Sequence, residues 1–161
     1  MNREALENAI RFCDSYTRLA ELIDLYDPSK ANADWFQVLG ENLTTCDNVW
    51  QFRVELVDIL GSASSEHIAL MMTQEERDAL AQLPDQITVY RGCFPWNADG
   101  FSWSLSREVA AAFTTLNRYR HDDHEATIRT ATVNKCDCVL KLDREEQEVI
   151  CWSLKDKEAH L

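Results

Sequence analysis

Apolar residues recur at every third or fourth position through the first part of the chain. In the opening segment they are Leu6, Ile10, Cys13, Tyr16, Leu19, Ile23 and Tyr26. This spacing places them on one face of a helix, so it predicts a helix over residues 3–26. Asp27-Pro28-Ser29 is expected to end that helix, because the residue before a proline avoids the helical conformation.

Two further helices are predicted between residues 35 and 60. The first lies around residues 35–39 and is closed by Gly40, since glycine commonly follows the last turn of a helix. The second covers residues 47–60 and is stopped by Gly61. Its expected inward side chains are Trp50, Val54, Val57 and Leu60.

Another helix is expected over residues 65–72. Thr73-Gln74-Glu75-Glu76 then has the residue types of a capping box, in which the first and last side chains each accept a backbone N–H. It predicts the start of one more helix, which ends near Leu83-Pro84.

The hydrophobic period changes to two in the second half, which indicates strands. The predicted strands cover residues 87–90, 101–104, 127–133, 136–142 and 146–152. One helix, 107–119, is capped by Ser106 and is expected to turn Val109, Ala112, Phe113 and Leu116 inward. We therefore predict an α+β fold in a single domain, 1–161. A helical part, 1–84, packs on a mostly antiparallel sheet in a β-rich part, 85–161.

The chain has 161 residues and a net charge of −12, from 28 acidic and 16 basic side chains. Such a surface repels nucleic-acid phosphates and anionic membranes, and it favours a basic protein partner, including one that handles nucleic acid. The N-terminal segment is charged and lacks the apolar core of a signal peptide. No apolar run reaches membrane-spanning length. We expect a cytoplasmic protein, while the oligomeric state stays open.

The six cysteines are expected to be reduced thiols. Cys136 and Cys138 lack the CxxC spacing of a zinc site, and an alternating strand would put both on one buried face with Leu140 and Leu142. His121-Asp122-Asp123-His124 is interpreted as a solvated loop, so no metal is expected. With only four glycines, the chain has no Gly-x-Gly-x-x-Gly segment, which excludes a Rossmann dinucleotide site.

Three short segments could carry chemistry: Tyr90-Arg91-Gly92, Phe101-Ser102-Trp103-Ser104 and Glu146-Gln147-Glu148. Each alone has an ordinary structural interpretation as a surface charge, a half-exposed strand or a solvated strand face. Together they combine a planar cation suited to phosphate, a glycine that admits close approach, and hydroxyls that can orient a carboxylate. Two carboxylates on one strand face also repel each other, which costs free energy unless a function uses them.

In this order the segments resemble the Arg, Ser-x-Ser and Glu-x-Glu motifs of the R-S-E class of mono-ADP-ribosyltransferases, in particular its small phage and bacterial members. The resemblance covers roughly the C-terminal half. It implies an enzyme that uses NAD+ as a substrate and needs no metal.

The resemblance also implies roles for individual residues. Arg91 would bind an NAD+ phosphate, and the Gly92 backbone would hold the nicotinamide amide. Ser102 would orient Glu148, which would bind the ribose hydroxyl and stabilise the developing cation. Glu146 would take a proton from an arginine acceptor on a protein target. The remaining NAD+-binding candidates are Tyr90, Ser104 and Phe113, with Tyr119 beside Phe113 as a candidate for stacking on nicotinamide.

Two other functions remain open at this point. The same residues could serve an NAD+ glycohydrolase with water as the acceptor. Alternatively, the acidic chain could act without catalysis, as a binding or inhibitor protein that covers a basic surface.

Overall fold

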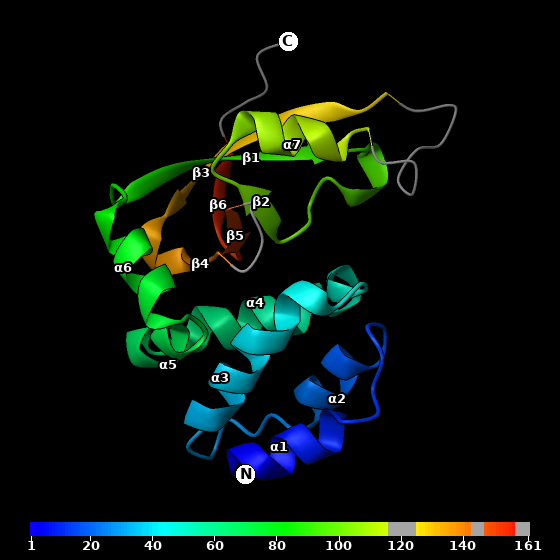
Figure 1. Ribbon diagram of the computed structural model, residues 1–161, viewed down its shortest axis with the longest axis vertical. Helices are drawn as coiled ribbons and strands as arrows, with labels where there is room; N and C mark the ends of the chain where they lie inside the picture. Colours follow the sequence, from blue (N-terminus) through cyan, green and yellow to red (C-terminus); the bar gives the residue numbers. More distant parts are fainter. Residues whose placement is uncertain (116–124, 143–146, 157–161) are drawn as a thin grey trace. The chain divides into compact units, whose positions relative to one another are not determined.

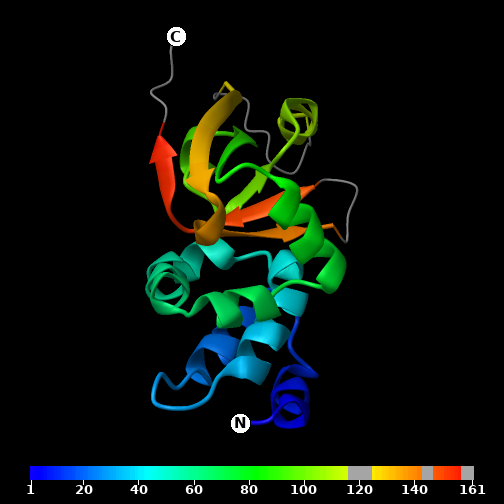
Figure 2. The same cartoon turned by 90° about the vertical axis from the view of Figure 1, so that its left-hand side faces the viewer.

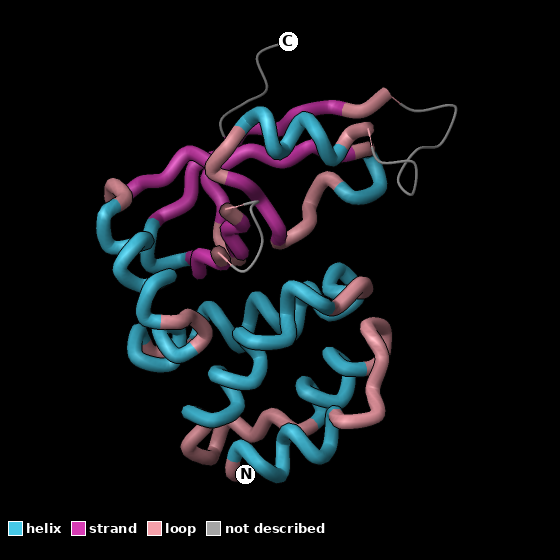
Figure 3. The backbone as a smooth tube through the Cα atoms, in the orientation of Figure 1, coloured by secondary structure: helices cyan, strands magenta, loops and turns pink. Residues whose placement is uncertain are grey.

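The computed structural model describes residues 1–115, 125–142 and 147–156 (Figure 1). Its contacts divide the chain into two compact units, Met1–Arg77 and Asp78–Leu161. Helices make up the first unit, and strands are confined to the second (Figure 3). The described residues form seven α-helices and one six-stranded antiparallel sheet, so the α+β prediction is confirmed at this level.

The helical unit contains short helices and two 3₁₀ turns. In chain order they are α1 (Arg3–Ile10), α2 (Arg18–Asp24), α3 (Ala33–Asn42), η1 (Leu43–Thr45), η2 (Val49–Phe52), α4 (Arg53–Ser62) and α5 (Ser65–Leu70). Helix α6 (Gln74–Gln82) spans the boundary between the units. The fully buried side chains of the helical unit are mostly aliphatic: Leu6, Leu19, Leu22, Phe36, Val38, Leu39, Leu56, Leu60 and Met71.

The prediction of one helix over residues 3–26 is wrong, because the chain turns between α1 and α2. The Asp14 carboxylate accepts the backbone N–H groups of Tyr16 and Thr17, both at 2.9 Å. Aspartate offers the backbone this local alternative to helical hydrogen bonds, and here it wins over the apolar spacing. Tyr16, expected on the buried face, is therefore exposed.

The inward face predicted for residues 47–60 is wrong at Trp50 and Val54 and right at Leu60. Trp50 and Val54 are exposed, whereas Leu56, Ile59 and Leu60 are buried. The segment starts as the 3₁₀ turn η2, which has three residues per turn instead of 3.6, so side chains before and after it fall on different faces.

Gly40 and Gly61 lie inside helices and do not end them. A Cβ atom at Gly40 would lie 2.2 Å from the backbone oxygen of Met71, so glycine allows α3 to approach the end of α5 closely. Nothing lies within 4 Å of a Cβ atom at Gly61. The capping box at Thr73 is confirmed, since the Glu76 N–H donates to the Thr73 hydroxyl at 3.2 Å and the Thr73 N–H donates to Glu76 at 2.8 Å.

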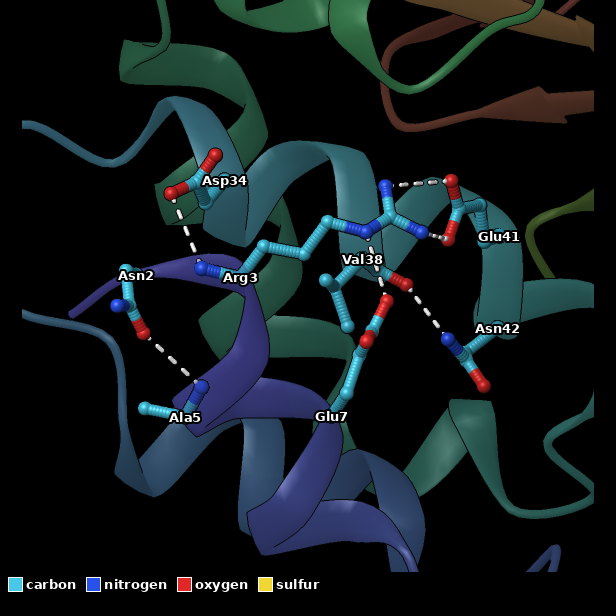
Figure 4. A network of polar contacts seen from close by, with 8 residues as sticks. All are labelled: Asn2, Arg3, Ala5, Glu7, Asp34, Val38, Glu41 and Asn42. Carbon is cyan, nitrogen blue, oxygen red and sulfur yellow. Dashed lines mark hydrogen bonds and ion pairs between the residues drawn. The ribbon is translucent and has the colours of Figure 1, made fainter.

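Arg3 connects α1 to α3 on the surface of the helical unit (Figure 4). Its guanidinium donates to both carboxylate oxygens of Glu41, at 3.0 and 2.7 Å, and to Glu7 at 2.7 Å. Its backbone N–H donates to Asp34 at 3.1 Å. A two-pronged arginine–carboxylate contact fixes the relative orientation of its two helices better than a single exposed ion pair does.

The sheet contains β1 (Gln86–Cys93), β2 (Ser102–Ser104), β3 (Thr127–Asn134), β4 (Cys138–Lys141), β5 (Glu148–Cys151) and β6 (Leu154–Asp156). Their spatial order is β4-β5-β2-β1-β3-β6, and each neighbouring pair is antiparallel (Figure 2). Strand β6 was not predicted, because three residues are too few to display a period. It pairs with β3 through Ala131, Thr132 and Val133.

Val149 on β5 lies opposite both Leu140 on β4 and Trp103 on β2, so these three buried side chains form an apolar row on one face of the sheet. Helix α7 (Arg107–Phe113) is capped as predicted, since the Ser106 hydroxyl accepts the Val109 N–H at 3.2 Å.

The predicted inward face of α7 is wrong at Ala112, while Val109 and Phe113 are half-buried. Ala110 is buried while Ala112 is exposed, because the backbone of Ala110 fits against the space left by Gly92. Leu116 lies outside the described residues.

The prediction of a strand through both Cys136 and Cys138 is wrong at its start. Residues Lys135–Asp137 form a 3₁₀ turn that leaves Cys136 exposed, and β4 begins at the buried Cys138. Burial raises the pKa of the Cys138 thiol to about 12. None of the described helices is both long and apolar enough to cross a membrane.

Candidate functional site

Glu148 belongs to a row of directly opposed residues that runs across the sheet. Its partner on β4 is Lys141 and its partner on β2 is Ser104. Ser104 in turn pairs with Tyr90 on β1, and Tyr90 with Thr130 on β3. Directly opposed side chains lie on the same face with Cβ atoms about 5 Å apart. The sheet therefore assembles a polar row from strands that are far apart in the sequence.

The centre of this row is buried. Lys141, Glu148 and Ser104 have exposed fractions of 6%, 9% and 5%. Removing charged groups from water costs free energy unless they are paired and hydrogen-bonded. The buried Lys141 and Glu148 therefore need compensating charges or hydrogen bonds within the protein. The Ser104 hydroxyl accepts the backbone N–H of Ser106 at 3.0 Å, which fixes the oxygen at the end of β2.

The structure distinguishes the two serines of the Ser-x-Ser segment. Ser104 is the residue opposite Glu148, whereas Ser102 is opposite Ile150, two positions further along. Ser102 is half-buried, and its backbone carbonyl accepts a hydrogen bond from Arg91. Ser104 is therefore the better placed hydroxyl to orient the Glu148 carboxylate, although the sequence pattern assigned that role to Ser102.

The segment before β5 differs from the expected strand. Gln147 has a φ of 45°, in the left-handed region that non-glycine residues adopt uncommonly, and β5 begins only at Glu148. The prediction that Glu146 and Glu148 share one strand face stays a prediction. Glu146 itself lies outside the described residues, so its assigned role stays a prediction. The Leu105 N–H donates to the Gln147 carbonyl at 3.4 Å, next to the end of β2.

Arg91 is held by backbone carbonyls. Its guanidinium donates to the Asn97 carbonyl at 3.1 and 2.9 Å and also to the Ser102 carbonyl. Strand alternation places Arg91 and its β3 partner Arg129 on the opposite face of the sheet from Tyr90, and therefore from Ser104 and Glu148. The expectation that the strands bring Arg91 and Glu148 together on one face is therefore wrong. These hydrogen bonds make Arg91 a residue that positions the connection between β1 and β2.

Arg129 reinforces the same connection. It donates to the Ala98 carbonyl and to the Asp99 carboxylate, both at 2.9 Å, and its guanidinium carbon lies 5.8 Å from the centre of the Trp103 ring.

Strands β1 and β2 meet at one point. Among the described residues, Tyr90 and Ser104 form the single pair that joins them, and the two strands diverge beyond it (Figure 1). The Arg91 side chain bridges from β1 to the Ser102 carbonyl just past this pair.

Close packing of α7 against β1 requires a glycine at position 92, which could not be predicted from the sequence. A Cβ atom here would lie 1.8 Å from the backbone oxygen of Ala110, so the glycine makes room for α7. The expectation that the missing side chain admits a ligand is corrected, because α7 occupies that space. Phe113, the last residue of α7, is half-buried, and Tyr119 lies outside the described residues.

Comparisons with known protein families, with curated proteins and with solved structures find no match for this chain.

Proposed function

We propose that the chain is an NAD+-dependent mono-ADP-ribosyltransferase that modifies a protein target on an arginine side chain. The observation that carries the proposal is the register of Tyr90, Ser104 and Glu148. Tyr90, Ser104 and Glu148 come from separate parts of the chain and share one face of the sheet, whereas Arg91 belongs to the other face. The candidate glutamate is buried next to a hydroxyl, as a preorganised carboxylate requires.

The reaction breaks the bond between the ribose and the nicotinamide nitrogen, and the bonding electron pair leaves with neutral nicotinamide. Because the leaving group is neutral, no strong acid is needed. Positive charge develops on the ribose, as in glycoside hydrolysis. Glu148 would stabilise that charge, and Ser104 would hold the carboxylate in place. A guanidine nitrogen of the acceptor then bonds to the ribose carbon and loses a proton, which is the role predicted for Glu146.

Two roles are considered for Arg91, positioning of the β1–β2 connection and binding of an NAD+ phosphate. The carbonyls of Asn97 and Ser102 give it a positioning role, because its guanidinium bridges the diverging ends of β1 and β2. Binding of an NAD+ phosphate remains a prediction from the resemblance. Arg91→Lys keeps the charge and loses the planar fork, so a positioning role predicts lower thermal stability as well as a higher KM for NAD+.

The experiment measures nicotinamide release from NAD+, and transfer of labelled ADP-ribose to lysate proteins, by the purified chain and by Glu148→Gln. We expect the substitution to lower both rates by about a hundredfold or more. Glu125→Gln is the matched control, because Glu125 is an exposed carboxylate in the same unit. Equal rates for wild-type protein and Glu148→Gln would refute the proposal.

An NAD+ glycohydrolase is the second candidate. The described polar row contains one carboxylate, Glu148, and hydrolysis needs no second carboxylate to accept a proton from a protein side chain. Release of nicotinamide without any labelled protein favours this activity. Full biological activity of Glu148→Gln, with no NAD+ consumption by either protein, favours a binding or inhibitor protein instead.

A further inference from the structure

The helical unit exposes five large apolar side chains, and the four other than Met1 lie on two segments. Phe12, Tyr16, Trp50 and Val54 have exposed fractions of 91%, 61%, 69% and 78%. We call these four residues the Trp50 surface. Single exposed apolar residues are common on proteins, but a cluster of them marks a place where another molecule binds.

Three hydrogen bonds join the two segments. The Asp47 N–H donates to the Ser15 carbonyl at 3.0 Å, and the Ser15 hydroxyl donates to the Asp47 carboxylate at 2.6 Å. The Asn48 side chain donates to the Tyr16 carbonyl at 2.6 Å. Asn48 directly precedes η2, the turn that carries Trp50. These hydrogen bonds hold residues 15–16, near Phe12 in the sequence, beside residues 47–48, which directly precede the segment that carries Trp50 and Val54.

Trp50 lies in the 3₁₀ turn η2, and Val54 lies in the first turn of α4, which follows η2 directly. The core of the unit is already supplied from another face of α4, by Leu56, Ile59 and Leu60. Burying an exposed apolar side chain against a partner is favourable in free energy. The side chains of the Trp50 surface stay exposed when the helical unit folds, so a binding partner can still bury them.

The net charge of the helical unit favours a basic partner. Residues 1–77 contain six basic and fourteen acidic side chains, which leaves a charge of −8 on the helical unit. A second copy of the chain would bring the same negative charge, and an anionic membrane would be repelled in the same way. A surface with lysine and arginine around apolar side chains is attracted over a long range and can then cover the apolar cluster.

We propose that the Trp50 surface binds a partner protein whose contact face has apolar side chains surrounded by lysine and arginine. This binding does not depend on the proposed enzymatic activity, since it uses none of the residues of the polar row.

The test uses a defined probe, a fluorescent 18-residue amphipathic helix of leucine and lysine, and a second peptide with glutamate in place of lysine. Fluorescence anisotropy of each peptide is measured with the full chain. We expect the lysine peptide to bind and the double variant Trp50→Ser/Val54→Ser to bind it about tenfold more weakly or worse, because central interface side chains contribute more than 1 kcal/mol each. Trp96→Ser removes an exposed tryptophan from the other unit and should leave binding unchanged.

Three results would overturn the inference. One is no binding of the lysine peptide to the wild-type chain, and another is equal binding by the wild-type chain and Trp50→Ser/Val54→Ser. The third is light scattering that detects a dimer of the wild-type chain and a monomer of the double variant, because a second copy would then be the occupant. Circular dichroism of the double variant confirms that it is folded before its binding is compared.

Discussion

Lys141 lies directly opposite Glu148 where β4 pairs with β5, and both residues are more than nine-tenths buried. The register brings the two charged side chains to neighbouring positions on one face, and removing one member of a buried ion pair costs about 3–5 kcal/mol. Replacing both members of such a pair by neutral groups avoids that cost. We therefore expect the effects of substituting Lys141 and Glu148 on the free energy of unfolding to be coupled.

Lys141→Met and Glu148→Gln should each lower the free energy of unfolding, and the double variant should lose less than the sum of the two single losses. The expected coupling is about 1 kcal/mol or more, as for residues in direct contact. Urea unfolding of the four proteins measures it. Strict additivity would mean that the two side chains do not interact across the strands.

Ser104→Ala should reduce nicotinamide release more than Ser102→Ala, because only Ser104 is opposite Glu148. Ser104→Ala also removes the acceptor of the Ser106 N–H, which costs about 1 kcal/mol of stability. Both variants are therefore assayed well below their midpoints of thermal unfolding. A larger loss in Ser102→Ala would favour the role that the sequence pattern assigned to Ser102.

The space around each glycine predicts how its substitution by alanine changes stability. Gly92→Ala and Gly40→Ala place a methyl group within 1.8 and 2.2 Å of backbone oxygens, so either helix must move away and stability should fall by about 2 kcal/mol or more. Gly61→Ala has open space within α4 and should raise stability by about 0.5–1 kcal/mol. Thermal unfolding measures all three. A stable Gly92→Ala would show that α7 does not need the close approach.

The cysteines predict a pattern of labelling. In the native protein at pH 8, a thiol reagent should modify the exposed Cys136 first, while Cys138 and Cys151 should react slowly. Burial raises the pKa of both thiols, so the reactive thiolate is scarce as well as inaccessible. Mass spectrometry with and without urea locates the modified residues. Rapid labelling of Cys138 in native protein would contradict this burial.

The same burial makes stability depend on pH. Unfolding returns Cys138 to an ordinary thiol pKa of about 8.5, whereas its folded pKa is about 12. Between these values the unfolded chain binds fewer protons than the folded chain. The contribution of Cys138 to stability is therefore present below pH 8.5 and falls as the pH rises toward 12. Cys138→Ala should weaken this alkaline loss of stability.

Much of the local structure followed from the sequence. The capping box at Thr73, the cap at Ser106 and the change from helices to strands were predicted because the residues responsible lie within a few positions of one another. Where two local signals competed, as at Asp14, the hydrogen bonds of a polar side chain outweighed the apolar period. The exposed Trp50 and Val54 could not be predicted, since a 3₁₀ turn leaves no distinct period in a few residues.

The sequence alone predicted the α+β class, because strand period and residue type are local properties, and its resemblance to a known family supplied the candidate residues Arg91, Ser102, Ser104 and Glu148. Only the tertiary structure decided that Ser104 is the serine opposite Glu148, that Lys141 completes their row, and that Gly92 serves α7. Register and close packing depend on strands and helices that are distant in the chain. A single residue of shift would move every side chain of a strand to the other face, and no local pattern specifies which partner it meets.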